Sequence, residues 1–168
     1  DVAVGLVAAV FSVIQFLFAP IFGSISDRIG RRPIILGSIL ANALGYVLFG
    51  LAGSFFMLLL ARVISGFGSA NISASQAYIA DISKPEERAK KMGIIGAAFG
   101  LGFVFGPPIG GWLFQIGGEK HGLEWVGFFT AVLCVLNFLW AYFALPESNL
   151  QKSGVKNKPV DTFKGMVK

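Results

Sequence analysis

The chain has 168 residues and a mean hydropathy of +0.72, and 55% of its residues are hydrophobic. A soluble domain of this length cannot bury so much apolar surface, so the composition excludes a typical water-soluble protein and predicts a membrane protein. A net charge of +5 would indicate nucleic-acid binding only if the basic side chains formed one face of a soluble fold.

Apolar stretches long enough to cross a bilayer follow one another along the chain. They cover residues 2–24, 34–51, 55–80, 93–116 and 125–145. About 20 residues at a rise of about 1.5 Å each cross a hydrocarbon core of about 30 Å, and a single segment satisfies its backbone there only as a helix. The sequence therefore predicts an all-α membrane protein with five transmembrane helices in residues 1–146, followed by a basic linker in residues 147–168.

The basic residues gather on one side of this predicted topology. Twelve of the fourteen Lys and Arg residues lie there: Arg28, Arg31, Arg32, Lys84, Arg88, Lys90, Lys91, Lys152, Lys156, Lys158, Lys164 and Lys168. The positive-inside rule assigns this side to the cytoplasm, so we expect a multi-pass protein of the cell membrane whose basic loops and tail are cytoplasmic. The distribution of positive charge therefore indicates the orientation of the chain in the membrane, and no nucleic-acid partner is expected.

Residues suited to catalysis or metal binding are scarce. Cys134 is the single cysteine and lies within an apolar stretch, and His121 has no metal-ligating residue at the usual spacing. No nucleophile with a base, and no set of metal ligands, can be assembled from the sequence. We therefore expect neither an enzyme nor a cofactor.

The first basic connector contains a short motif, Gly23-Ser-Ile-Ser-Asp27-Arg28-Ile-Gly30-Arg-Arg-Pro. Gly30 suits a chain reversal with positive φ, and Gly23 suits a close helix contact. The motif resembles the signature loop of the major facilitator superfamily, G-x-x-x-D-R-x-G-R-R/K. By that resemblance, Asp27 and Arg28 form a conformation-sensitive ionic latch on the cytoplasmic side. The alternative is that the arginines only anchor the loop to lipid headgroups.

The same resemblance assigns further residues to the latch. Arg31 and Arg32 complete the motif, and Asp81 ends the third apolar stretch on the same side of the membrane. In the family's charge network, Asp81 would pair with Arg28 or Arg31. As a simple alternative, Asp81 is a solvated charge at a helix end.

Arg62 lies about seven residues into the third stretch, roughly 10 Å from its outer end at helical rise. A charged side chain near the bilayer centre costs about 2.5–3.5 kcal/mol, so we expect it to face a wet cavity or a carboxylate. Arg62 and Gly66 resemble an R-x-x-x-G pattern on the family's fourth helix, where the arginine is implicated in proton coupling. The alternative is an arginine that extends outward to the interface.

The fourth stretch carries glycines at fixed spacing. Gly93, Gly102, Gly106, Pro107, Gly110 and Gly111 follow the pattern G-x8-G-x3-G-P-x2-G-G. Glycines four residues apart expose backbone for close packing, and the proline removes a donor and bends the helix. The pattern resembles the antiporter signature on the fifth helix of drug and tetracycline exporters. A generic glycine zipper is the alternative.

Together these motifs imply helices two to six of a six-helix N-terminal bundle, in a carrier of twelve or fourteen helices. The resemblance implies proton-coupled efflux of a drug or small hydrophobic metabolite by alternating access, as in drug resistance. The expected partners are this substrate, protons, lipid and the remaining helices. Gln15 is a weak candidate for substrate contact, with interhelical hydrogen bonding as the simpler alternative. A sugar or organic-acid facilitator or symporter, and a non-transporting sensor or scaffold, remain alternatives.

Overall fold

The computed structural model describes residues 2–148, and every regular element within that range is an α-helix. The elements are α1 (Val2–Ile29), α2 (Arg31–Gly50), α3 (Phe55–Ser69), α4 (Ile72–Asp81) and α5 (Pro85–Ala144). The predicted all-α class is confirmed. Asp1 and residues 149–168, which hold most of the predicted basic linker, lie outside the described residues.

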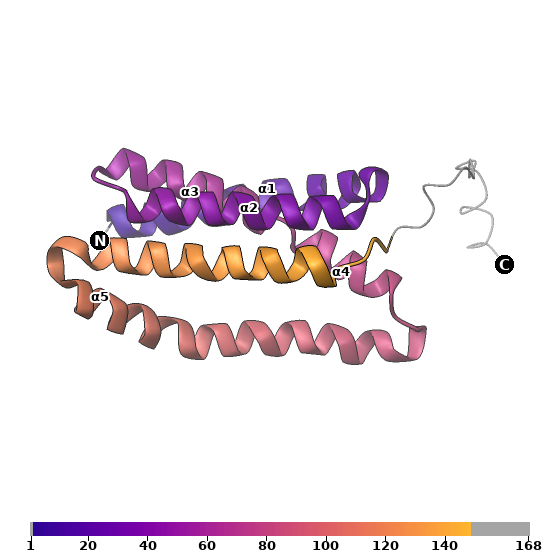
Figure 1. The fold of residues 1–168 in the computed structure, drawn as a ribbon. Helices are drawn as coiled ribbons and strands as arrows, with labels where there is room; N and C mark the ends of the chain where they lie inside the picture. The colour runs from indigo at the N-terminus through magenta and orange to yellow at the C-terminus, as the bar shows by residue number, and fades with distance from the viewer. Residues whose placement is uncertain (1, 149–168) are drawn as a thin grey trace.

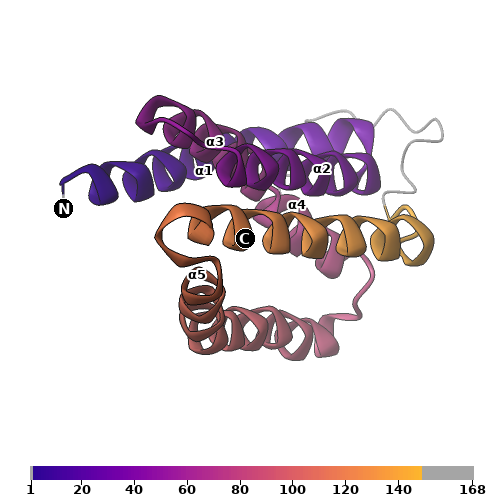
Figure 2. The ribbon, with the colours of Figure 1, turned by 60° about the vertical axis from the view of Figure 1, so that its left-hand side comes forward.

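The helices run back and forth between two ends of a bundle (Figure 1). One end gathers the junction of α1 with α2, the end of α4 and both ends of α5; we call it the basic end. The other end holds the α2–α3 turn and the bend in α5. Figures 1 and 2 agree that the second half of α5 lies beside α2, while its first half stands apart from α1, α2 and α3.

The first connector is much shorter than the apolar pattern predicted. The chain stays helical beyond Ser24 as far as Ile29, and α2 begins at Arg31 rather than Ile34. Gly30 alone separates the two helices, with φ 121° and ψ 154°, and its amide donates to the Ser26 carbonyl at 3.1 Å. Hydropathy marks only the apolar part of a helix, and polar residues continue the helix beyond the bilayer core.

The third predicted stretch forms two helices instead of one. α3 ends at Ser69 and α4 begins at Ile72, and the Ala70 amide donates to the Phe67 carbonyl at 3.2 Å, as in a tightened last turn. Glycine, serine and asparagine, which dominate this region, have low helix propensity. Residues 55–81 together are still long and apolar enough for one crossing.

The fourth and fifth predicted stretches belong to one helix, α5, which changes direction at Gly118. Gly118 has φ 65° and ψ −175°, whereas Pro107 and Pro108 keep helical dihedral angles. By length and hydropathy, four helical segments of the described chain could cross a membrane, and the longest of them, α5, contains two of the five predicted stretches, one on each side of Gly118. A glycine can adopt positive φ without a Cβ clash, and this explains why the turn occurs there.

Small residues bring the helices close together. A Cβ added to Gly68 would lie 2.6 Å from the Asn42 amide of α2, and one added to Gly127 would lie 2.9 Å from the Tyr46 carbonyl. A core cluster at the basic end includes Ile35, Ile39 and Tyr78. Close backbone contact replaces large buried side chains in such bundles, because water does not drive helix association in lipid.

Candidate functional site

Arg31 is the centre of a charge cluster at the basic end. Its side chain is buried, yet its Nη2 lies 2.5 Å from Asp27 Oδ1 and its Nε lies 3.2 Å from Asp81 Oδ2. Nη1 also donates to Ser26 Oγ at 2.6 Å. One guanidinium thus joins the end of α1, the start of α2 and the end of α4, and two carboxylates neutralise its charge.

The pairing differs from the one carried over from the family motif. Arg28, one of the three arginines assigned to the latch, is exposed and forms no ion pair with any residue in the range 2–148. Asp27 contacts Arg31 instead, four residues along the chain. Because the helix continues to Ile29, Arg28 lies on a different face from the one that packs against α4. Asp81 contacts Arg31, one of the two partners that the sequence left open.

Glu147 was missed by sequence reasoning and completes this cluster. Its Oε1 accepts from the Arg31 amide at 2.8 Å and its Oε2 accepts from the Arg32 amide at 3.2 Å. The N-cap residue of α2 is Gly30, which has no side chain to accept hydrogen bonds from the first amides of the helix. Glu147, which lies beyond α5, supplies the carboxylate at this helix N-terminus instead. The only signal in the sequence was an acidic residue directly after the last apolar stretch.

Arg32 links α2 to the end of α5 through contacts with Tyr142. Its Nη2 donates to the Tyr142 carbonyl at 2.6 Å, and its guanidinium carbon lies 5.4 Å from the centroid of the Tyr142 ring. With Glu147, this contact ties the signature motif to the end of α5 and the residues directly after it.

Arg62 lies on α3 and contacts the far end of α2. Its guanidinium carbon is 4.4 Å from the centroid of the Phe49 ring. Arg62 also lines a cavity of about 300 Å³ whose other walls come from α1, including Phe11 and Ser12. Arg62 was expected to face a cavity or a carboxylate, and the structure places it beside a cavity; the apolar stretches contain no carboxylate, and the Phe49 ring lies against the guanidinium.

Small residues of α3 and α4, among them Gly66 and Ser73, make a close contact with α1. A Cβ on Gly66 would lie 2.7 Å from the Phe11 carbonyl, and Ser73 Oγ donates to the Ala19 carbonyl at 2.6 Å. Gln15 Nε2 donates to the Ser69 carbonyl at 3.3 Å. In this structure Gln15 links two helices, which is the simpler of its two predicted roles.

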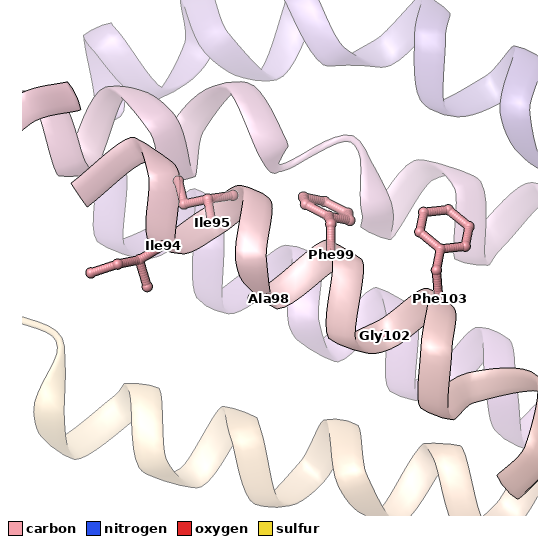
Figure 3. Close-up of a pocket in the computed structure, with 6 residues that line it drawn as sticks. All are labelled: Ile94, Ile95, Ala98, Phe99, Gly102 and Phe103. Carbon is pink, nitrogen blue, oxygen red and sulfur yellow. The ribbon is translucent and has the colours of Figure 1, made fainter. Parts of the chain in front are cut away.

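The glycine pattern lies on the half of α5 that stands apart. A Cβ added to any of its glycines would meet nothing within 4 Å: Gly93, Gly102, Gly106, Gly110 and Gly111. Figure 3 shows Ile95, Phe99 and Phe103 projecting from one side of this helix, beside a cavity of about 550 Å³. The described chain leaves this stretch of bare backbone uncovered.

A larger cavity of about 750 Å³ lies between α2, α4 and both halves of α5. Its walls are mainly apolar, with Asn71, Gln76 and Asn137 as polar groups and Phe99 and Trp140 as aromatic ones. Such a lining suits a small molecule with an apolar body and a few hydrogen-bonding groups.

The sequence model of one protein family, described as Major Facilitator Superfamily, matches residues 1–167. The chain belongs to the Major Facilitator Superfamily. Major facilitator superfamily domain-containing protein 10 of Bos taurus is 40% identical over 86% of this chain and 30% of its own length. Tetracycline resistance protein, class C, of Escherichia coli is 37% identical over 86% of this chain and 35% of its own length. The chain spans about a third of these relatives.

A solved member of the superfamily has a similar fold. The crystal structure of the human organic anion transporter MFSD10 matches with a TM-score of 0.76 and 37% sequence identity, over 86% of this chain and 32% of that one. The resemblance inferred from the motifs is therefore confirmed, and the chain covers an N-terminal part of a Major Facilitator Superfamily protein. The relatives are multi-pass membrane transporters, and the match indicates no catalytic family.

Proposed function

We propose that this chain forms part of a proton-coupled antiporter that exports a drug or small hydrophobic metabolite by alternating access. The observation that carries the proposal is the uncovered glycine face of α5 between Gly93 and Gly111. Bare backbone on one face allows a second helix to approach closely and to slide along it. The similarity to tetracycline resistance proteins supports export as the direction of transport.

The charge cluster at the basic end supports a latch in this cycle. We assign the basic end to the cytoplasm, in the cell membrane, by the distribution of Lys and Arg. Asp27, Arg31 and Asp81 would hold α1, α2 and α4 together in one state of the carrier. The contacts with Asp27 and Asp81 are partly open to solvent, so a change of state need not break a fully buried ion pair.

Arg62 is the proposed coupling residue. It is the only charged residue within the apolar stretches of this sequence, and it lines a cavity. A cation there lowers the pKa of any carboxylate that approaches it, and so favours proton release at that point of the cycle. Gly66, one turn along α3, lets α1 pack closely beside it.

A second candidate substrate class is the organic anions. Arg62 places an uncompensated positive charge beside a cavity with mainly apolar walls, and such a site suits an anion with an apolar body. The similar human structure carries the name organic anion transporter. The sugar facilitator or symporter and the non-transporting sensor have no comparable observation in their favour.

Transport by the complete carrier tests the proposal. In inside-out vesicles with an acidic lumen, tetracycline or the organic anion fluorescein should accumulate only while the pH gradient lasts. Gly106→Leu should abolish accumulation, while Gly5→Leu, at another helical glycine with nothing within 4 Å, should preserve it. Accumulation without a gradient would contradict proton antiport, and no movement of either probe would favour a sensor.

A further inference from the structure

The Arg62 guanidinium rests on a ring rather than on a carboxylate. Its central carbon lies 4.4 Å from the Phe49 ring centroid, within the range of a favourable cation–π contact. The five apolar stretches of the sequence contain no Asp or Glu. A guanidinium in such surroundings needs an electron-rich partner, and the face of Phe49 is the one that the described chain supplies.

The backbone around Phe49 is held in place, and the residue is buried. Phe49 is 8% exposed, and the next residue, Gly50, packs so closely on α5 that an added Cβ would lie 3.3 Å from the Glu124 carbonyl. After the helix, the Ala52 amide donates to the Phe49 carbonyl at 3.3 Å in the turn that leads to α3. The backbone therefore fixes the position of Phe49, and burial limits the space open to its ring, whereas Arg62 has a long side chain with more rotatable bonds.

Arg62 lies at the border between this ring and the cavity of about 300 Å³ lined by α1. An anion in the cavity would compete with the ring for the same guanidinium. Charge–charge attraction in a low-dielectric site is stronger than a cation–π contact. The guanidinium would therefore pair with the anion when one is bound, and would lie against the ring when no anion is bound.

We propose that Phe49 is a positioning residue that holds Arg62 when no anion occupies the cavity and takes it back when the anion leaves. The proposal rests on the function proposed above for Arg62. It predicts that the ring weakens anion binding and speeds release. A ring that only fills space would do neither.

The contact itself can be tested without transport. In the complete carrier in nanodiscs, labelled with 15N-arginine, the Arg62 side-chain signal should be shifted upfield by the ring, and Arg62→Lys identifies it by its disappearance. Phe49→Leu should remove the upfield shift. Phe22→Leu, at a phenylalanine of the same 8% exposure that contacts other rings, should leave it. A signal unaffected by Phe49→Leu would overturn the proposal.

The role is tested by kinetics with fluorescein as the transported anion. Phe49→Leu should lower both KM and kcat by about fivefold, Phe49→Tyr should restore wild-type values, and Phe22→Leu should not lower KM. A raised KM, or no rescue by tyrosine in a folded carrier, would overturn it. If fluorescein is not transported at all, the proposed function fails, and the side-chain signal of Arg62 still decides whether Phe49 holds it.

Discussion

Single residues at the basic end act through contacts that reach far along the chain. Arg31, on α2, joins two carboxylates and a hydroxyl from α1 and α4, whereas Arg28, in the same motif, is exposed. Glu147 reaches the α2 N-terminus from beyond α5. How much a charged residue contributes to the contacts between helices here depends on its burial and on the number of its partners, more than on whether it belongs to the motif.

Arg31→Ala should weaken this end, and Arg28→Ala should not. The first change leaves Asp27 and Asp81 without their shared cation and Ser26 without its donor, a loss of about 1–3 kcal/mol. Thermal unfolding in detergent measures the difference. Equal effects of the two variants would show that the pairing with Arg31 is not what stabilises the end of α4.

Gly30→Ala should be destabilising for two separable reasons. The residue has φ 121°, and an added Cβ would lie 2.6 Å from Glu147 Oε2. Strain of this kind costs about 1–3 kcal/mol. Gly53→Ala, at a loop glycine without positive φ and with open space, is the control. In a Glu147→Ala background the clash disappears and the backbone strain remains, so the loss in unfolding temperature should be smaller there.

At the scale of helices, glycines have two different uses in one chain. Some glycines of α2, α3 and the second half of α5 are covered by neighbouring backbone, as at Gly68 and Gly127, whereas those between Gly93 and Gly111 in the first half of α5 are open. The same residue type thus builds the bundle in one place and leaves a surface in another. The sequence spacing alone does not separate the two uses, because both occur in apolar helices.

Gly68→Ala should separate α2 from α3, because the added Cβ would lie 2.6 Å from the Asn42 amide and 2.8 Å from the Ser38 carbonyl. Overpacking of this kind costs about 1–3 kcal/mol. Gly37→Ala, in α2 with open space, should leave stability equal or improve it by up to about 1 kcal/mol. Denaturant titration of the helical signal compares the variants, and a neutral Gly68→Ala would contradict the close contact.

For the whole molecule, the prediction concerns orientation. In a Cys134→Ser background, the variants Lys84→Cys and Lys120→Cys, each made separately, should react with a membrane-impermeant thiol reagent from opposite sides of sealed vesicles. Lys84 follows α4 at the basic end, whereas Lys120 follows the bend at Gly118. Labelling of both from one side would contradict the proposed topology and, with it, the assignment of the basic end to the cytoplasm.

The sequence by itself determined the all-α membrane class, the superfamily and the positive φ of Gly30, because hydropathy, motif spacing and glycine chemistry are local properties. Only the tertiary structure decided that Arg31 rather than Arg28 meets Asp27, that Glu147 serves α2, and that Phe49 lies against Arg62. The tertiary structure also decided where helices begin and end around Gly30, Ala70 and Gly118. These features depend on which helix faces meet, and residues more than a hundred positions apart meet only when the bundle has formed.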